Sequence, residues 1–286
     1  LRGSNMNTAY LENHTRTGMI AIAVPLDKGI IELSYFQACT MGVCEAAALA
    51  GCEVLLVYSD YRDLKHMRSL VEAHKIDGVI ITRTYSDDVA AAYLKQEGVP
   101  FVTLGCLPDT DIVQVDNDHE EACKELTMMS VMKGRRHIAF LSSHDQNVVN
   151  RRRFEGYCEA LRCANMKIDP RIIFHDVDSQ TQAEQIMDGL LGFGVDSIIC
   201  NDEVISFWAY TKLRKEGVDV PGQVELSSCY HSNALENYVP SITTVKYDAK
   251  LLGSTACTIL SDMLAGKKVP QKTFLSYEFN IKKGSS

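Results

Sequence analysis

The stretch Met19-Ile-Ala-Ile-Ala-Val-Pro25 is apolar on consecutive residues, which is typical of a strand covered on both faces. A helical pattern, Ser34–Ala50, follows it, and short apolar runs alternate with helical patterns along most of the chain. This alternation predicts parallel sheets with helices on each side, in a doubly wound α/β architecture with right-handed crossovers.

The same pattern places the other elements. Further strands are expected at Glu53–Tyr58, Gly78–Thr82, Phe101–Gly105, Ile112–Val115, His137–Ser142, Ile172–His175, Asp196–Cys200 and Val224–Cys229. Further helices are expected at Leu64–His74, Asp87–Glu97, Asp118–Met132, Arg152–Asn165, Thr181–Phe193 and Glu203–Glu216. Glycines follow four of the helical runs, where a left-handed residue closes a helix, at Gly51, Gly98, Gly134 and Gly217. A long helix with one apolar face, Asp248–Gly266, has no strand immediately before it, and a last strand covers about Thr273–Ile281.

The length and composition predict two lobes. The chain has 286 residues, of which 46% are hydrophobic and 23% charged, so it buries a sizeable core without disulfides or metal ions. About five strand–helix units precede Gly134 and about four follow it. Two sheets of four to six strands fit the usual size of a sheet better than one sheet of nine or more.

The charge balance and the apolar runs exclude several classes of protein. The chain has 29 Lys and Arg residues against 37 Asp and Glu, which gives a net charge of −8. This segment is therefore a poor candidate for direct binding to nucleic acid or to an anionic membrane. No apolar run approaches the roughly 18 residues of a membrane-spanning helix, and no secretory signal opens the chain. Residues 1–16 are interpreted as a tag or linker remnant.

The ten cysteines show no C-x-x-C spacing, and most of them lie among apolar neighbours. They are predicted to be free thiols packed as small hydrophobic side chains in a reducing cytoplasm, rather than zinc ligands or a disulfide framework.

Catalytic and cofactor motifs are missing from the sequence. It contains no G-x-S-x-G, no G-x-x-x-x-G-K-[ST] and no H-E-x-x-H. The run Asp116-Asn-Asp-His-Glu120 resembles the opening of a calcium loop, but position six is Glu121 and position twelve is Thr127. The sequence therefore predicts a protein that is not an enzyme, with no metal site and no cofactor.

Polar and aromatic residues do follow the predicted strands, where open α/β sheets bind ligands. They are Tyr35 and Phe36, Asp116 with Asn117, Arg153 at the end of Arg151-Arg-Arg153, Asn201 with Asp202, and Tyr230 with His231. Aromatic faces with a few hydrogen-bonding groups suit a small polar organic ligand.

Each of these residues also has a purely structural interpretation. Asp116, Asn117 and Asp202 stand where helix N-caps belong. Tyr35 and Phe36 could belong to the core of an alanine-rich helix. Of the three arginines, Arg153, three residues before Gly156, is expected to point inward and the other two to be solvated or paired at the surface. Trp208 is expected to pack within its helix.

An ordered set of short motifs extends over nearly the whole chain. They are Ile20-Ala-Ile-Ala-Val-Pro25, Gly78-Val-Ile-Ile81, Val115-Asp-Asn117, Gly134-Arg-Arg-His-Ile-Ala-Phe-Leu141, Arg153-Phe-Glu-Gly-Tyr157, Ile198-Ile-Cys-Asn-Asp202, Gly217-Val-Asp-Val-Pro221 with Val224-Glu-Leu226, Pro240-Ser-Ile-Thr-Thr244, Leu252-Gly253 and Ile281-Lys-Lys-Gly-Ser285. From about Thr17 to Ser285 the chain thus resembles the effector-binding domain of LacI/GalR-family transcription regulators, whose fold is that of periplasmic sugar-binding proteins.

The resemblance implies two lobes that the chain crosses three times, near Gly134–His137, Thr244–Tyr247 and Gly266–Pro270. The N-terminal lobe would then comprise residues 17–135 and 247–266, and the C-terminal lobe residues 136–246 and 267–286. The resemblance also implies a homodimer in the cytoplasm. The helix-turn-helix that reads operator DNA in this family would precede Thr17, and the sixteen residues there carry no such pattern.

The resemblance further implies a small-molecule effector in a cleft between the lobes. By position, its contacts map to Tyr35, Phe36, Asp116, Arg153, Asn201, Asp202, Tyr230 and Tyr247. The turn after Val224–Cys229 usually presents an acidic residue and here reads Cys229-Tyr230-His231, and Tyr247 stands where a polar side chain such as Gln is common. Losing a carboxylate that accepts two hydroxyl groups would cost a sugar about 1.5–3 kcal/mol per charged hydrogen bond. The expected effector is therefore a less hydroxylated molecule, or a sugar held by aromatic stacking.

The sequence leaves two other functions open. An extracytoplasmic sugar-binding protein of a transporter would share the fold, although ten cysteines without evident pairing argue against it. A hydrolase or isomerase would need an acid–base pair in the same place, for which His231 beside Tyr230 is the only hint. The motifs name neither the effector nor the genes it controls, and they do not say whether it induces or co-represses.

Overall fold

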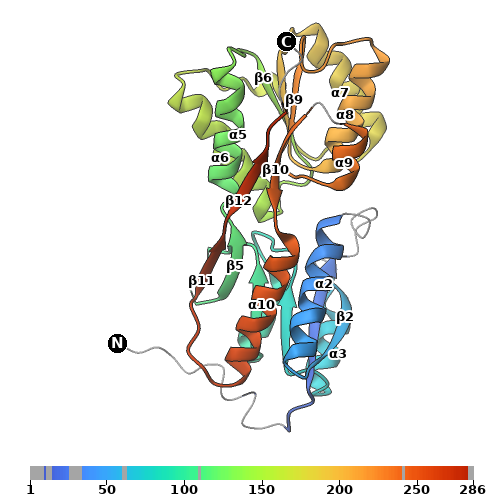
Figure 1. The fold of residues 1–286 in the computed structure, drawn as a ribbon. Coiled ribbons are helices and arrows are strands. Elements are labelled where there is room, and N and C mark those ends of the chain that lie inside the picture. The colour runs from blue at the N-terminus through green and yellow to red at the C-terminus, as the bar shows by residue number, and fades with distance from the viewer. Residues whose placement is uncertain are drawn as a thin grey trace. The chain divides into compact units, whose positions relative to one another are not determined.

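The computed structural model describes residue 10 and residues 15–25, 34–59, 63–108, 111–239 and 242–282. The chain forms two compact units, residues 1–117 with 248–275 and residues 118–247 with 276–286. Each unit contains one sheet of six strands with helices packed against it (Figure 1).

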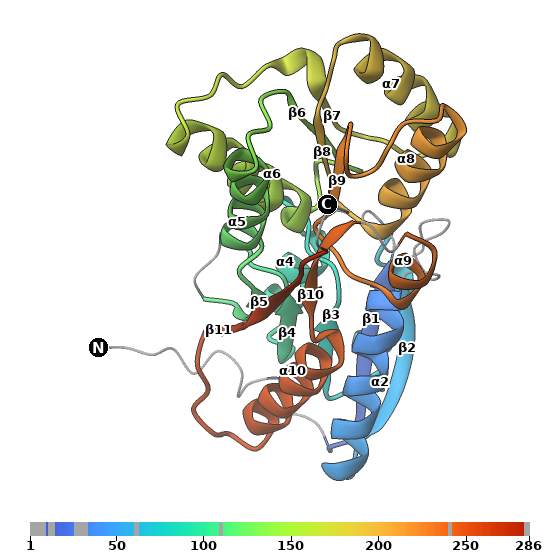
Figure 2. The same cartoon turned by 45° about the horizontal axis from the view of Figure 1, so that its top comes forward.

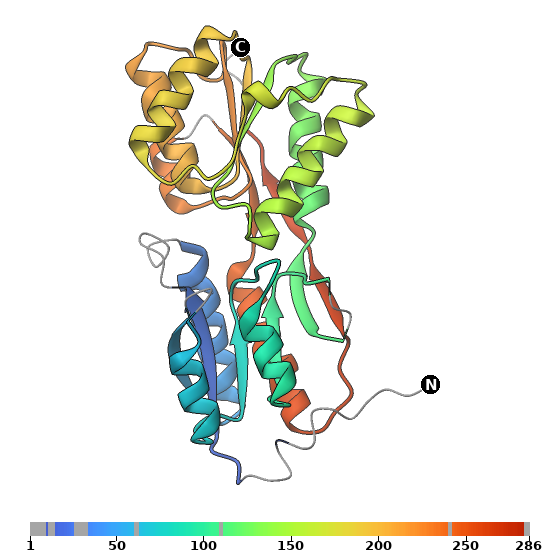
Figure 3. The same ribbon diagram turned by 180° about the vertical axis from the view of Figure 1, so that it is seen from behind.

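The sheet of the first unit is wholly parallel, with the strand order β11-β5-β4-β3-β1-β2. Its strands are β1 (Met19–Pro25), β2 (Glu53–Ser59), β3 (Gly78–Ile81), β4 (Phe101–Leu104), β5 (Val113–Asn117) and β11 (Lys272–Leu275). Its helices are α2 (Ser34–Leu49), α3 (Lys65–Glu72), α4 (Val89–Gln96) and α10 (Ala249–Leu264). Helices α2 and α10 lie side by side against one face (Figure 1), and the view from behind shows α3 and α4 on the other (Figure 3).

The core of the first unit explains why its first strand is apolar throughout. Ile20, Ile22 and Val24 alternate along β1 and pack with side chains from α2 and α10. The two helices approach each other so closely that a Cβ atom on Gly42 would overlap the carbonyl of Lys250, and one on Gly253 would overlap that of Cys39. Only glycine allows this backbone contact at these positions.

The sheet of the second unit has the order β12-β10-β9-β8-β6-β7, and all its pairs are parallel except β10 with β12. Its strands are β6 (Ile138–Leu141), β7 (Ile173–Phe174), β8 (Ser197–Cys200), β9 (Glu225–Ser228), β10 (Thr243–Tyr247) and β12 (Tyr277–Asn280). Its helices are α5 (His119–Met132), α6 (Val148–Cys163), α7 (Gln180–Gly192), α8 (Glu203–Lys215) and α9 (Asn233–Tyr238), with a 3₁₀ turn at Pro170–Ile172. Figure 2 shows the strands between α5 with α6 on one side and α7 with α8 on the other.

Helices α5 and α6 pack against each other through a glycine. A Cβ atom at Gly156 of α6 would overlap the backbone carbonyl of Glu120 at the start of α5. The hydroxyl of Tyr157, which is fully buried, donates a hydrogen bond of 2.8 Å to the carbonyl of Ile138 and so ties α6 to β6. These contacts pack the third turn of α6 against the start of α5 and against β6.

The predicted architecture of two parallel-dominated sheets with interleaved helices is confirmed. The four glycines expected to close helices all have positive φ angles, between 68° and 86°. All ten cysteines are free, and seven of them are buried, as expected of packed thiols: Cys39, Cys106, Cys123, Cys158, Cys200, Cys229 and Cys257.

Several expected element boundaries are wrong. Strand β10 directly precedes the long helix, where no strand was expected, and α9 was not expected at all. The single last strand, Thr273–Ile281, is two strands, because β11 pairs with β5 in the first sheet and β12 with β10 in the second. Helix α6 begins at Val148 rather than Arg152.

The expected lobe boundaries also differ from the two units. The first division lies after Asn117 rather than near Gly134–His137, because α5 packs against α6 and therefore belongs to the second unit. The last division lies after Leu275 rather than near Gly266–Pro270, because β11 still pairs in the first sheet. The long helix belongs to the first unit, as expected.

The N-cap of α10 allows a direct test of local stability. The Asp248 carboxylate accepts a hydrogen bond of 2.8 Å from the backbone N–H of Leu251. We expect Asp248→Ala to lower the free energy of unfolding by about 1 kcal/mol, because a helix N–H loses its acceptor. Urea denaturation followed by circular dichroism measures the change. Asp248→Asn keeps an acceptor and should be nearly neutral, so equal losses for both variants would contradict the capping role.

Candidate functional site

Arg153 is the central polar group at one end of the second unit's sheet. Its side chain leaves the second turn of α6 and is only 6% exposed, whereas Arg151 is exposed and Arg152 pairs with Glu120 at 2.6 Å. Arg153 Nη1 donates to the carbonyl oxygen of Asn201 at 2.7 Å, and Nη2 lies 3.4 Å from Nδ1 of His119. Its Nε atom is buried without a hydrogen-bond partner among the described residues. The prediction that Arg153 is the inward-pointing arginine is confirmed.

A second buried group, Asn201, comes directly after β8. Its Nδ2 atom donates to Oδ1 of Asn150 at 2.7 Å, and Asn150 in turn donates to Ser143 Oγ at 3.0 Å and to the carbonyl of His144 at 2.8 Å. This chain of hydrogen bonds fixes the orientation of the Asn201 amide. Its Oδ1 atom stays buried and unpartnered within the described part of the chain.

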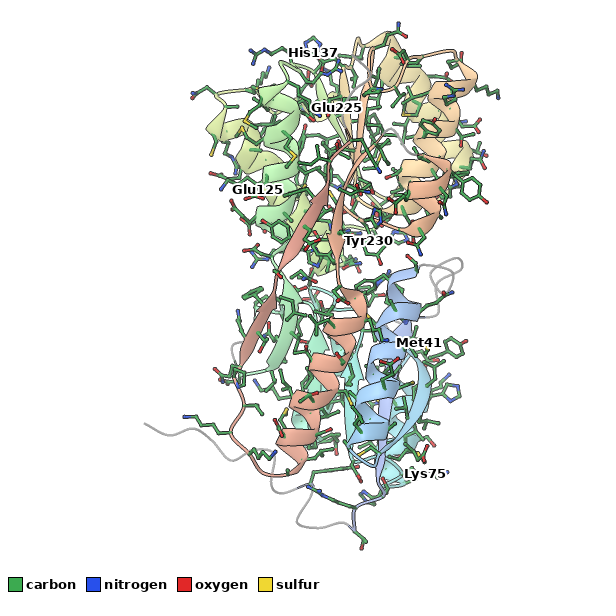
Figure 4. The ribbon with its side chains drawn as sticks, viewed as in Figure 1. Met41, Lys75, Glu125, His137, Glu225 and Tyr230 are labelled. Carbon is green, nitrogen blue, oxygen red and sulfur yellow. The ribbon has the colours of Figure 1, made fainter. Side chains whose placement is uncertain are left out.

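Aromatic rings lie beside these two groups. Tyr230, labelled in Figure 4, and Tyr247 are nearly parallel, with an interplanar angle of 19° and ring centroids 6.4 Å apart. The ring centroids of His119 and Tyr247 are 4.8 Å apart in an edge-to-face arrangement. The Arg153 guanidinium carbon lies 5.8 Å from the Tyr247 ring centroid, within the range of a cation–π contact. The cluster thus combines flat apolar faces with directed polar atoms.

The electrostatics of the cluster keep Arg153 charged and Tyr247 neutral. Burial raises the pKa of the Tyr247 hydroxyl, and the nearby charge of Arg153 opposes this rise only in part. Burial by itself would lower the pKa of Arg153, but interactions with Tyr247, Cys229, Cys123 and Asp202 outweigh it and raise that pKa. The Tyr247 hydroxyl is also buried without a hydrogen-bond partner among the residues described.

Sheet topology explains why these residues meet. Asn201 follows β8, Tyr230 follows β9 by two residues, and Tyr247 ends β10, so all three stand at the carboxyl ends of neighbouring parallel strands. Helices α5 and α6 bring His119 and Arg153 to the same end. Ligands bind at this end of open α/β sheets.

The first unit holds the other predicted residues. Phe36 is buried in the core of this unit, and its ring centroid lies 5.1 Å from that of Tyr35 in an edge-to-face arrangement. The guanidinium carbon of Arg83 also lies 5.1 Å from the Phe36 ring centroid. The Asp116 carboxylate is buried and accepts backbone hydrogen bonds from Cys106 at 3.0 Å and Asn117 at 2.8 Å. Phe36 therefore has a packing role, and Asp116 holds the loop that follows β4.

The capping interpretation is correct for one acidic residue and wrong for the other two candidates. Asp202 caps α8, since its Oδ1 atom accepts hydrogen bonds from the N–H groups of Val204 and Ile205 at 3.0 and 2.9 Å. Helix α5 is capped not by Asp116 or Asn117 but by Asp118, which accepts from Glu121. Trp208 packs against the core of the second unit, as expected of a helix-packing residue.

Sequence reasoning missed His119 and Asn150 as members of the cluster. Asn150 stands one helical turn before Arg153, so the two lie on one face of α6. The expected helix start at Arg152 leaves Asn150 outside the helix and hides this relation. The sequence marks His119 only as part of the run Asp116–Glu120, which does not match a calcium loop. In the first unit, Arg83 after β3 was likewise missed.

Two features are absent from the described residues. Within the described ranges, no group of three or more His, Cys, Asp or Glu side chains is arranged to hold a metal ion. No helix in the described part of the chain is long and apolar enough to cross a membrane.

The chain is similar in sequence and fold to known proteins. The family of periplasmic binding proteins and sugar-binding domains of the LacI family matches residues 20–283. The HTH-type transcriptional regulator CelR of Thermobifida fusca is 24% identical over 260 residues, which cover 88% of this chain and 76% of CelR. The HTH-type transcriptional repressor PurR of Mannheimia succiniciproducens is 23% identical over 253 residues, which cover 85% of this chain and 74% of PurR.

A solved structure described as a complex of the transcriptional regulator CelR with cellobiose superposes with a TM-score of 0.85 at 24% identity, covering 93% of this chain and 84% of that one. Because the family match spans most of the sequence, the chain belongs to the LacI-family group of sugar-binding and periplasmic-binding-protein domains.

Proposed function

We propose that this chain is the effector-sensing domain of a LacI-type transcription regulator and that the effector binds at the Arg153 cluster of the second unit. The observation that carries the proposal is the presence of three buried polar atoms without partners within the described residues: Arg153 Nε, Asn201 Oδ1 and the Tyr247 hydroxyl. Buried polar groups in native proteins are nearly always hydrogen-bonded, so a set of unsatisfied atoms in one cluster is best explained by a ligand that completes them.

The three atoms define the chemistry of the ligand. Arg153 Nε donates, so it needs an acceptor such as a ring or hydroxyl oxygen. Asn201 Oδ1 accepts, so it needs a hydroxyl or amine donor. The Tyr247 hydroxyl does either. Together with the ring faces of Tyr230 and Tyr247, this favours a hydroxylated ring compound, either a sugar or an aromatic glycoside.

The regulatory consequence follows from differential binding. An effector that interacts more strongly with one arrangement of the two units than with another shifts the equilibrium between them, without undergoing any reaction. In a homodimer, such a shift changes the spacing of two DNA-reading domains and thereby the affinity for operator DNA. This proposal places the protein in the cytoplasm, with operator DNA contacted by a domain outside this segment.

The first test is a ligand titration. CelR was solved with cellobiose, so cellobiose is the first probe, followed by monosaccharides, nucleosides and aromatic glycosides in a thermal-shift screen. For the compound that binds, Tyr247→Phe should weaken affinity roughly two- to tenfold in isothermal titration calorimetry, because one hydrogen bond is lost while the ring remains.

Tyr238→Phe is the matched control, since Tyr238 is 71% exposed and should leave affinity unchanged. Tight binding of a simple pentose or hexose that both Tyr247→Phe and Tyr230→Leu leave intact would contradict the proposed site.

A further inference from the structure

Two cysteines lie against the Arg153 cluster in direct contact with each other. Cys123 stands one turn after His119 on α5, and Cys229 comes directly after β9 and before Tyr230. Their Sγ atoms are 3.5 Å apart, within hydrogen-bonding distance for sulfur, and both side chains are fully buried. The two residues are 106 positions apart in the sequence, so the fold itself brings them together.

Their surroundings give the two thiols different acidities. Burial by itself would raise the pKa of Cys229, but the contact with Cys123 and the positive charge of Arg153 outweigh it and hold this pKa below its usual value. Burial raises the pKa of Cys123, and so do its hydrogen bond and its electrostatic interaction with Cys229. Other buried thiols without a nearby cation behave differently, since burial raises the pKa of Cys39 to about 12 and that of Cys257 to about 11.

We propose that Cys123 and Cys229 are an oxidisable dithiol that peroxides convert into a reversible disulfide within the second unit. The proposal rests on the contact between the two sulfur atoms, and the positive charge of Arg153 acts on both of them. A thiolate next to a cation is the reactive form of cysteine, and a second thiol in contact resolves the oxidised one.

The chemistry balances in two steps. The Cys229 thiolate attacks one oxygen of hydrogen peroxide and the O–O bond breaks, which gives a sulfenic acid on Cys229 and hydroxide. The Cys123 sulfur then attacks the Cys229 sulfur, so that the S–S bond forms and the S–O bond breaks. The oxygen leaves as water with the thiol proton. Two electrons pass from the sulfur atoms to the peroxide, and an external dithiol reverses the change.

Closing the disulfide must move the site. A disulfide bond is about 2.05 Å long, so the sulfur atoms must approach by about 1.5 Å from their 3.5 Å separation. The residue after Cys229 is Tyr230, and α5 carries His119, so both flanks of the cluster shift. Oxidation also removes the Cys229 thiol, whose pKa Arg153 lowers.

The test uses the full chain, reduced and exposed to increasing hydrogen peroxide, then denatured, alkylated with N-ethylmaleimide and digested without reductant. Mass spectrometry should find a peptide pair joined through Cys123 and Cys229 that dithiothreitol separates, while Cys39 and Cys257 are alkylated. Cys163 is exposed and serves as the internal measure of oxidant dose. Alkylated Cys229 at a dose that fully oxidises Cys163, or pairing of Cys229 with a different cysteine, would overturn the proposal.

Three variants separate the steps. In Cys123→Ser, dimedone should trap a sulfenic acid on Cys229 in place of the disulfide. In Cys229→Ser, Cys123 should stay reduced, because burial, the largest cause of its raised pKa, is still present. In Arg153→Gln, disulfide formation should require a higher pH, since the thiolate on Cys229 loses its neighbouring charge. An unchanged pH profile, or oxidation of Cys123 without Cys229, would contradict the assignment of Cys229 as the attacking thiol. Because these readouts need no effector, they stand or fall independently of the proposed function.

Discussion

Arg153→Ala is expected to abolish measurable effector binding while leaving the melting temperature within a few degrees of the original. The variant removes the buried Nε donor, the hydrogen bond to the Asn201 carbonyl and the contact with His119. A hydrogen bond to a charged group contributes about 1.5–3 kcal/mol, so losing one weakens binding about 10- to 150-fold, and losing the order that Arg153 imposes on its neighbours weakens it further.

The small expected effect on stability has a physical reason. Arg153 has no carboxylate within ion-pair distance among the described residues, so removing its side chain leaves no oppositely charged partner buried alone. The main loss is the hydrogen bond to the Asn201 carbonyl, and in a chain of this size about 1 kcal/mol shifts the melting temperature by only about 2–4 °C.

Arg152→Ala is the matched control for Arg153→Ala. Arg152 stands next to Arg153 on α6 but is partly exposed and pairs with Glu120 and Glu155. Exposed ion pairs contribute only about 0–1 kcal/mol, so both affinity and stability should change little. Calorimetric titration and thermal denaturation measure the two properties separately. A large loss of stability in Arg153→Ala with binding retained would identify Arg153 as a structural residue instead.

Gly156→Ala is expected to have the largest effect on stability. The added methyl group would overlap the carbonyl of Glu120, and a backbone atom cannot move aside as a side-chain tip can. Helices α5 and α6 must therefore separate, and overpacking of this kind costs about 1–3 kcal/mol. Because α5 carries His119 and α6 carries Arg153, effector affinity should fall along with stability.

Gly189→Ala is the control for Gly156→Ala. Gly189 is also inside a helix, α7, but nothing lies within 4 Å of the Cβ atom it would gain. The same substitution there should stabilise the protein by about 0.5–1 kcal/mol, since alanine loses less conformational entropy than glycine in a helix. Denaturation of both variants by urea measures the difference. A neutral Gly156→Ala would show that α5 and α6 tolerate a wider separation.

The sequence predicts the strands and helices of this fold well where each element carries its own pattern. Strand β1 is one example, because burial on both faces leaves a continuous apolar run. The four glycines that close helices are another, because a left-handed backbone favours glycine. Strand β10, Thr243–Tyr247, was missed because its residues Thr-Thr-Val-Lys-Tyr lack the continuous apolar run of the other strands. The division between β11 and β12 was missed because the choice of partner sheet is a tertiary property that no local pattern records.

The candidate site also contains residues that the sequence predicts and contacts that it does not. Arg153 could be identified as buried from its position before Gly156 and Tyr157, and Tyr230 from its place after a strand. Neither the hydrogen bond from Arg153 to Asn201 nor the contact of Cys123 with Cys229 could be predicted, since each joins segments that only the sheet order brings together.

The division of the first unit into two stretches of sequence also bears on how the protein forms during synthesis. Leu252 and Leu260 of α10 complete the first unit's core, so residues 17–117 cannot close that core until residues 248–275 have left the ribosome. The second unit has its own core within residues 118–247 and gains only the outer strand β12 from the end of the chain. The half of the molecule that is translated later therefore completes its core first, and the N-terminal half waits in the nascent chain with apolar strands uncovered, a period during which a chaperone would have most to protect.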